Sequence, residues 1–420
     1  MYIVDNIFIK RLKIYTALTL VLCLLLISCT NTVKKDEIED DGIRELAFIE
    51  DLSNIQKINL STVASGIEYC ILETDKKCLV TPNAKLYCTK KYIVSIGDKE
   101  CYVFERETGN FVRQISRMGQ GPGEYTEIAN VFWDANKEQV CVWSHPYYIF
   151  YNIDGTISHK INRNEYPFFS QDVIAYHEYY VKYIPNVSGN EKQRIVFLDR
   201  TGALTDSILN FRTWKKTQSS YMGGNSGNFH VFRDELYYTD KFCDTLYLIE
   251  DFILKPKYVF NTDGHTLPYQ TQDGVPRYNF VESVMKGEDL TDQWQQYFVL
   301  DRILEDSKNL YITFDFQTKK YPVIYNKKED ILQIMPPISI PLPYRDFIIP
   351  LYGFENDLDG GLPFWPSKMI SDKEMMCVFT AEELLALDAS KIIDEKLKNI
   401  LNSLEEDSNP VVAIVTLKDN

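Results

Sequence analysis

Short runs of apolar and aromatic residues recur along most of the chain, and they come in pairs separated by turn residues. Tyr, Phe, Ile and Val predominate in these runs, and such side chains suit a pleated, half-buried strand. Turn residues such as Thr108-Gly109-Asn110 follow the second run of most pairs, which predicts a hairpin to a further outer strand. The six pairs are 92–96 with 102–105, 139–143 with 149–152, 179–183 with 195–198, 236–238 with 246–249, 310–314 with 323–326, and 375–379 with 411–415.

The spacing of these pairs predicts a β-propeller. The early pairs begin roughly 45–50 residues apart, and about 40–50 residues are typical of a four-stranded propeller blade. Insertions near 261–300, 336–370 and 381–408 widen the later spacings. Residues 56–60 and 67–73 also have a strand pattern, and we expect a strand supplied from this N-terminal side to join the last blade and close the ring. The predicted fold is therefore all-β, a six-bladed β-propeller over residues 56–420, with a β-sandwich or a two-domain β protein as alternatives.

The insertion at 381–408 has the pattern of a helix. Thr380 and Glu383 have the spacing of a capping box, in which the two residues satisfy each other's backbone N–H groups. The chain returns to a strand pattern after Pro410. The apolar residues expected on one face of this helical insertion are Ile393, Leu397, Ile400, Leu401 and Leu404.

The N-terminus has the pattern of an export signal. Three basic residues between positions 10 and 13 precede an uncharged run over 14–27, which is shorter than the ~20 residues of a membrane span. The run ends at Leu26-Ile27-Ser28-Cys29, which resembles the lipobox of bacterial lipoproteins. The resemblance implies that residues 1–28 are a signal peptide and that Cys29 carries the lipid. A plain signal peptide and an uncleaved anchor are the alternatives.

Residues 29–55 are predicted to be an acidic, flexible tether, because their composition cannot bury a core. Thr30, rather than Asp, follows Cys29, which favours the outer membrane and leaves the leaflet open. The acidic stretch over 36–41 is either a spacer or an address for display at the cell surface.

The net charge limits the classes of binding partner, and the cysteine spacing bears on whether the thiols form a motif. The chain carries 45 Lys and Arg against 60 Asp and Glu, a net charge of −15, so nucleic acid and anionic lipid surfaces are poor partners. The cysteines after Cys29 form no Cys-x-x-Cys pair, and we expect most of them to be small buried core residues. They are Cys70, Cys78, Cys88, Cys101, Cys141, Cys243 and Cys377.

The most specific internal motif lies between the first two pairs. It comprises Gly119, Gly121, Pro122, Gly123, Glu124 and Tyr125, with Arg117 ahead of them. With the preceding segment 104–111, it resembles the first-blade signature of six-bladed β-propeller lipoproteins of Gram-negative bacteria. Ile71-Leu72-Glu73-Thr74, Asp244-Thr245-Leu246-Tyr247 and Asn409-Pro410 look like further marks of that family.

This resemblance covers residues 55–417. The chain is also similar, more distantly, to NHL-repeat propellers. It implies the propeller and the lipid anchor, whereas most members of the family have no assigned activity. Read from the residues themselves, the glycines predict a sharp turn between blades. Pro122 and the absence of a following Lys-Ser/Thr argue against a phosphate loop.

Candidate chemistry is sparse. The five His residues show no metal-binding spacing, and no Gly-x-Ser-x-Gly elbow occurs, so no cofactor, metal or catalytic residue is predicted. Trp143 and Trp365 lie beside prolines at strand ends or in insertions and are candidate ligand-facing aromatics, with packing between blades as the alternative. We therefore expect a non-enzymatic cell-envelope module that binds or scaffolds a glycan, peptide or partner protein. The alternative is a metal-dependent lyase or lactonase with its site in the central channel.

Overall fold

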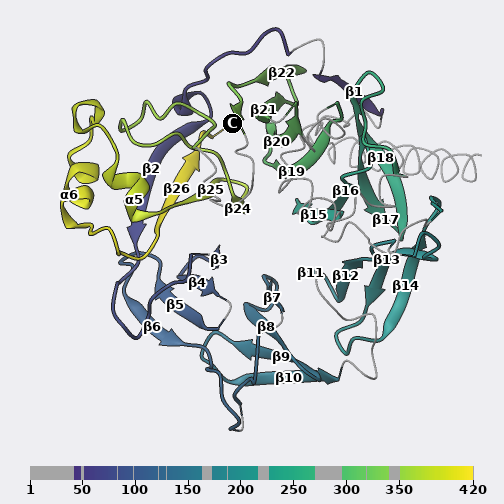
Figure 1. Cartoon of the computed structure of the whole chain (residues 1–420), viewed down its shortest axis with the longest axis horizontal. Coiled ribbons are helices and arrows are strands. Elements are labelled where there is room, and N and C mark those ends of the chain that lie inside the picture. Colours follow the sequence, from purple (N-terminus) through teal and green to yellow (C-terminus); the bar gives the residue numbers. More distant parts are fainter. Residues whose placement is uncertain are drawn as a thin grey trace, which may run out of the picture. The chain divides into compact units, whose positions relative to one another are not determined.

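The computed structural model describes residues 42–48, 52–82, 84–97, 99–121, 123–128, 130–162, 173–186, 188–215, 227–269, 296–317, 319–339 and 351–419. The chain separates into two compact units, 1–42 and 43–420, and nearly all described residues belong to the second. In that unit, six sheets surround a common axis (Figure 1). The predicted six-bladed β-propeller is confirmed.

Blades 1–3 are four-stranded antiparallel sheets that follow one another along the chain. From the inner to the outer strand, blade 1 is β3 (Lys85–Cys88), β4 (Tyr92–Ile96), β5 (Cys101–Glu105) and β6 (Phe111–Gln114). Blade 2 is β7 (Asn130–Asp134), β8 (Gln139–Ser144), β9 (Tyr147–Asn152) and β10 (Ile157–Asn162). Blade 3 is β11 (Val173–Tyr176), β12 (Tyr179–Tyr183), β13 (Gln193–Leu198) and β14 (Leu204–Leu209).

Blades 4–6 each include a strand that departs from this simple order. Blade 4 is β15 (Gly227–Phe232), β16 (Glu235–Asp240), β17 (Thr245–Glu250), β18 (Ile253–Asn261) and β1 (Arg44–Ala47). Blade 5 is β19 (Val299–Glu305), β20 (Asn309–Phe316), β21 (Lys319–Asn326) and β22 (Ile331–Ile334), with β23 (Ile338–Ser339) paired to β21. Blade 6 is β24 (Lys368–Ser371), β25 (Glu374–Phe379), β26 (Val411–Leu417) and β2 (Ala64–Ile71).

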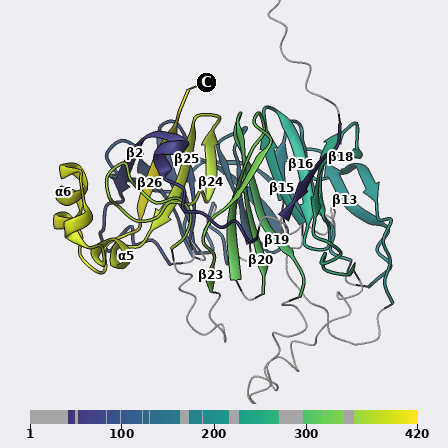
Figure 2. The same ribbon diagram turned by 90° about the horizontal axis from the view of Figure 1, so that it is seen from above.

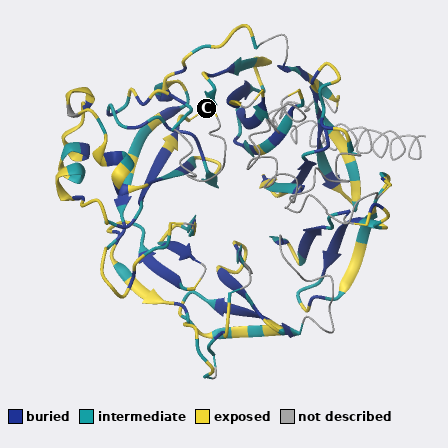
Figure 3. Cartoon of the chain, viewed as in Figure 1, coloured by how far each residue is buried: buried dark blue, intermediate teal, exposed yellow. Residues whose placement is uncertain are grey.

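Each of the six predicted pairs forms the two central strands of one blade. These strands are almost continuously buried, as in β13 and β20, whereas outer strands such as β14 are largely exposed (Figure 3). Blades pack face to face, so both faces of a central strand are covered. Such a strand therefore reads as a continuous apolar run rather than as an alternating one.

Strands from both ends of the propeller sequence build blade 6. β2 pairs antiparallel with β26, in register from Ala64 opposite Leu417 to Ile71 opposite Val411. The prediction that a strand from the N-terminal side joins the last blade is confirmed, and this strand is β2 rather than residues 56–60. Closure is reinforced by Asn409, a buried residue just before β26 whose side chain binds the backbone of segment 73–80.

The segment before β2 runs along the outer edges of blades 4, 5 and 6. β1 pairs in parallel with β18, and Phe48 packs with ring centroids 5.3 Å from Phe260 and 5.1 Å from Phe314. Farther along, Gln56 donates its N–H to Ile334 O of blade 5. Part of the predicted flexible tether is thus a strand with a buried apolar side, which corrects the boundary at residue 56. Residues 29–41, including Cys29, lie outside the described residues.

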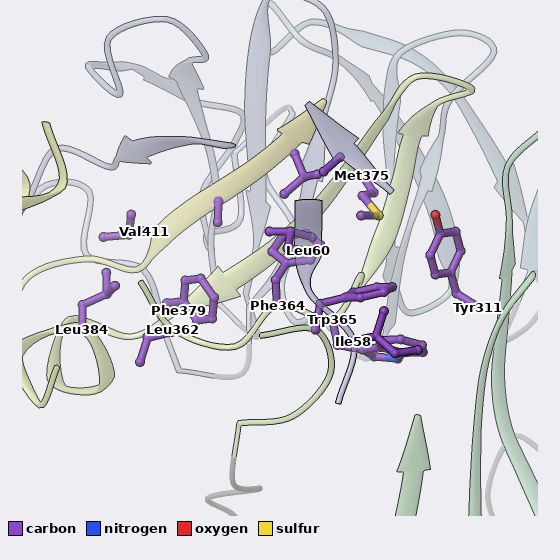
Figure 4. Close-up of a cluster of buried hydrophobic side chains, with 14 of the residues drawn as sticks. Ile58, Leu60, Tyr311, Leu362, Phe364, Trp365, Met375, Phe379, Leu384 and Val411 are labelled. Carbon is purple, nitrogen blue, oxygen red and sulfur yellow. The ribbon is translucent and has the colours of Figure 1, made fainter. Parts of the chain in front are cut away.

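The insertion between β25 and β26 is helical, as predicted. It contains α5 (Ala381–Leu385), the 3₁₀ turn η3 (Ala389–Lys391) and α6 (Glu395–Ser403), and the capping box of Thr380 and Glu383 is present. Leu397 and Leu404 are buried, but Ile393 is 70% exposed and lies outside the expected face. Leu384 of α5 belongs to the same buried apolar cluster as Leu60 of the 3₁₀ turn η1 (Leu60–Thr62), and Figure 4 shows it near Val411.

No described helix combines the length and the apolar character needed to cross a membrane. The seven described cysteines are free thiols, and five of them are buried. Burial raises the thiol pKa, to about 12 for Cys101, as expected of inert core residues.

Candidate functional site

The antiparallel blades place two different sets of loops on the two faces of the propeller. Connections between the second and third strands, and from the outer strand to the next blade, lie on one face, which we name the insertion face because it carries α5 and α6. The remaining hairpin turns lie on the other, the turn face. Figure 2 shows the two faces edge-on, with the chain leaving β26 on the turn face.

Near the insertion face, polar side chains of three inner strands reach across blade boundaries. Each donates a hydrogen bond to a backbone carbonyl of the next blade, so blades 4, 5, 6 and 1 are linked in sequence around the axis. The three bonds are Asn228 Nδ2 to Asp301 O at 2.9 Å, Arg302 Nη1 to Ser367 O at 3.1 Å, and Lys368 Nζ to Leu86 O at 2.7 Å.

Among these three hydrogen-bond donors, Lys368 has the environment that differs most from that of an exposed side chain. Its ammonium nitrogen lies 3.1 Å from the ring centroid of Tyr87, and its side chain is partly buried. Burial, followed by the nearby charges of Lys85 and Arg302, lowers the pKa of Lys368 to about 7. Protonated and neutral forms therefore coexist near neutral pH, and the Tyr87 ring face and the Leu86 carbonyl accommodate the charged form.

The local charge balance is strongly positive. Lys320 pairs with Asp301 at 2.9 Å and with Asp315 at 2.7 Å. Burial raises the pKa of the Asp301 carboxyl, but Lys320 and neighbouring cations that include Lys241 outweigh it, so that pKa is lowered. Lys320 thus pairs with both carboxylates and offsets one of their two negative charges, which leaves one negative charge against the remaining cations of this region.

The other cations of this region are not neutralised in the same way. In the part of the chain that the structure describes, none of them pairs with a carboxylate. We name the group of five cations the cationic mouth, and it stands out in a chain of net charge −15. Its members are Lys85, Lys241, Arg302, Lys320 and Lys368.

A pocket of about 550 Å³ opens on the turn face between blades 5 and 6. Lys308 Nζ donates to Lys418 O at 3.2 Å and to Asp419 O at 3.0 Å, and Lys373 pairs with Asp419 at 2.7 Å. Charged groups that line this pocket are therefore already engaged with the segment after β26. In the cationic mouth, four of the five cations have no carboxylate partner among the described residues, so it is the stronger candidate site.

The glycine motif predicted to connect blades forms a tight loop between β6 and β7. The Glu124 carboxylate accepts hydrogen bonds from Arg117 Nε at 2.6 Å and from Gly121 N at 2.8 Å. A Cβ atom at Gly119 would lie only 2.0 Å from Glu124 Oε2, so glycine is required for the carboxylate to fold back into the loop.

The remaining residues of this motif also have structural roles. Gly123 has a φ of +97°, which glycine adopts without steric penalty. Tyr125 is buried and donates its hydroxyl to Lys99 O at 2.8 Å. Pro122 lies outside the described residues. These contacts are those of a loop that joins blades 1 and 2.

The two candidate ligand-facing tryptophans lie within the blades. Trp365 is 6% exposed, donates its indole N–H to Thr313 Oγ1 at 2.9 Å and contacts the ring of Tyr311 (Figure 4). Burial leaves Trp365 no open face for a ligand, so the structure does not support the predicted role and favours packing. Trp143 in β8 is partly buried and stacks on Tyr148, with ring centroids 5.9 Å apart.

Sequence reasoning missed the cationic mouth. Lys85, Arg302 and Lys368 lie on inner strands, whereas the hydrophobic pattern marked the central strands. Lys241 directly follows β16 and Lys320 lies near the start of β21, and single Lys and Arg residues carried no spacing signal. Among the residues that the structure describes, no group of three or more His, Cys, Asp or Glu side chains is arranged to hold a metal ion.

The fold and this site define a six-bladed β-propeller with the cationic mouth on its insertion face. A family model, a domain of unknown function (DUF4934), matches residues 45–416, and the chain belongs to this family. No curated protein matches the chain.

Comparison with solved structures finds similar chains at low sequence identity. A Bacteroides fragilis protein described as exported is 17% identical, with a TM-score of 0.62, and the match covers 90% of this chain and 100% of that one. A Bacteroides vulgatus member of the DUF4221 family is 11% identical, with a TM-score of 0.49, over 85% of this chain and 97% of that one. The β-propeller domain of Swd1 from Myceliophthora thermophila is 8% identical, with a TM-score of 0.33, over 65% and 76%.

Proposed function

We propose that this protein is an exported, lipid-anchored binding module that holds an acidic glycan at the cationic mouth. The observation that carries the proposal is the set of cations without carboxylate partners among the described residues, contributed by blades 1, 4, 5 and 6. Converging charges of one sign create a local potential that attracts an opposite charge, even in a chain that is acidic as a whole.

The chemistry of these groups suits carboxylate ligands. The Arg302 side chain is exposed and offers a planar fork that can bind a carboxylate through two parallel hydrogen bonds. Lys85 is also exposed, and Lys368 lies beside the Tyr87 ring. An anion bound between these groups stabilises the protonated form of Lys368, so binding is coupled to proton uptake.

The location is proposed on separate grounds. The lipobox-like end of the signal segment predicts attachment through Cys29, and the Bacteroides fragilis protein that shares the fold is described as exported. A periplasmic or surface position, anchored to the outer membrane, is part of the proposal. No observation favours the metal-dependent lyase or lactonase alternative, so the proposal assigns binding rather than catalysis.

The test compares acidic and neutral sugars on the full chain in detergent. Binding of digalacturonate and of maltose is measured by calorimetry for the wild type, for the double variant Lys85→Glu/Arg302→Glu, and for Lys90→Glu. Lys90 is an exposed lysine on the turn-face side of blade 1 and serves as the matched control. We expect the acidic disaccharide alone to bind, at least tenfold more weakly in the double variant and unchanged in the control. Equal binding of the two sugars, or a double variant that binds like the wild type, contradicts the proposal.

A further inference from the structure

A second cationic feature lies on the insertion face, at the exit from blade 3. Phe211, two residues after β14, is 61% exposed, which is unusual for a large aromatic side chain. The guanidinium carbon of Arg194 lies 4.6 Å from its ring centroid, and that of Arg212 lies 5.4 Å away. An exposed ring beside two guanidinium groups forms a surface that is both apolar and positively charged.

The two arginines are in different electrostatic situations. Arg194 is buried and pairs with the buried Asp240, which neutralises its charge. Arg212 donates Nη1 to Phe242 O at 2.5 Å and packs 5.6 Å from the Tyr269 ring centroid, but among the described residues it forms no ion pair with a carboxylate. Arg212 therefore contributes the available positive charge at this position.

Hydrogen bonds and charge interactions connect this feature to the cationic mouth. The Phe242 carbonyl that accepts from Arg212 follows directly after Lys241, a member of the mouth. Lys241 acts on the pKa of Asp301 in blade 5, and the hydrogen bonds from Arg302 and Lys368 continue the connection to blades 6 and 1. The positive groups thus follow one another around the insertion face.

Five consecutive blades each contribute one such cation. In blade order they are Arg212 at the exit of blade 3, Lys241 in blade 4, Arg302 in blade 5, Lys368 in blade 6 and Lys85 in blade 1. The mouth can hold a short acidic ligand, but Arg212 lies beyond it, at the exit of blade 3. A row with one charge per blade instead matches a chain that carries one anionic group per repeating unit.

We infer that the ligand is a polymer, an acidic polysaccharide of several uronic-acid units, which extends from the cationic mouth to Phe211 and Arg212. The inference rests on the proposed function and deepens it by naming the class of ligand. A sugar polymer is favoured over an acidic peptide because each unit combines a carboxylate with a ring that can contact exposed aromatic surface such as Phe211.

The test is the dependence of affinity on ligand length. Galacturonate oligomers of two, four and eight units are titrated into the full chain in detergent, with malto-octaose as the neutral control and octaglutamate as the acidic peptide. We expect the octamer to bind at least tenfold more tightly than the dimer. The variants Arg212→Gln and Phe211→Ala should lose about tenfold in affinity for the octamer and nothing for the dimer. Arg233→Gln is the matched control, because Arg233 also follows a phenylalanine, Phe232, but lies in a turn on the opposite face.

The outcomes separate the two proposals. If the dimer binds at the mouth but the octamer gains nothing, or if Arg212→Gln leaves octamer binding intact, the polymer inference is wrong while the proposed function stands. If octaglutamate binds more tightly than the octagalacturonate, the assignment to a glycan is overturned. If no acidic oligomer binds, the proposed function fails as well.

Discussion

Asn409 joins the two ends of the propeller sequence through its side chain. Its Nδ2 donates to Glu73 O at 2.7 Å and to Cys78 O at 2.9 Å, and its Oδ1 accepts from Val80 N at 2.8 Å. The residue is 2% exposed, so water cannot easily replace these bonds. We predict that Asn409→Ala weakens ring closure, because it leaves one backbone N–H and two backbone carbonyls, all buried or partly buried, without their partner.

The size of the effect follows from the cost of unsatisfied buried groups, about 1–3 kcal/mol each. Two of the contacts are only partly buried, so a total of about 3–5 kcal/mol is expected. The compact unit from Ile43 to Asn420 has 378 residues, and unfolding entropy is about 2.1 cal/mol/K per residue, or roughly 0.8 kcal/mol/K for the whole unit. The melting temperature should therefore fall by about 4–6 °C.

Differential scanning calorimetry of the wild type and Asn409→Ala measures this shift directly. Asn54→Ala is the control, because Asn54 is exposed and makes none of these contacts. For a unit of this size, a loss of 1 kcal/mol shifts the melting temperature by only about 1–2 °C. A variant that melts within about 1 °C of the wild type would therefore show that the Asn409 bonds contribute little to closure.

Four further changes test other parts of the reasoning. Affinity for digalacturonate should fall as pH rises from 6 to 8, because the anion favours the protonated form of Lys368, which lies against the Tyr87 ring. The pKa of Lys368 is about 7 because of burial and the facing charges of Lys85 and Arg302. Lys368→Arg should flatten this pH profile, and a wild type whose affinity does not change with pH refutes the prediction. Arg194→Met should destabilise the fold by about 3–5 kcal/mol in urea unfolding, because it leaves the buried Asp240 carboxylate unpaired. The double variant Arg194→Met/Asp240→Asn should recover most of that loss. If the single and double variants lose the same stability, the cost does not come from the unpaired charge of Asp240. Deleting residues 409–420 removes β26 and should abolish the cooperative melting transition; an unchanged transition contradicts ring closure by β26. Cys29→Ala should move the protein from the membrane to the soluble fraction, and continued membrane retention refutes lipid anchoring there.

Much of the propeller could be predicted because its signals are local. A central strand is covered on both faces, so runs such as 310–314 and 323–326 read as continuous apolar segments in any context. The capping box of Thr380 and Glu383 is likewise complete within four residues. Ring closure was predictable because the strand pattern left strand-like segments before the first blade and an incomplete blade at the end, although only the structure shows that β2 is the closing strand.

Other features depend on residues that are distant in the sequence. β1 follows an acidic stretch, and only the uncovered edge of β18 and the rings of Phe260 and Phe314 make it a strand. The same limit applies to Trp365, whose neighbouring prolines suggested an exposed loop while Thr313 and Tyr311 enclose it.

The sequence by itself determined the strand runs, their grouping into six blades and the helical insertion, since hydrophobic periodicity and capping act over a few residues. The tertiary structure alone decided which charges meet. Lys85, Arg302 and Lys368 are separated by up to 283 positions and carry no motif, yet ring closure brings blade 6 against blade 1 and sets Lys368 on Leu86 and Tyr87. Electrostatic sites of this kind arise from distances in space, which no local pattern of residues encodes.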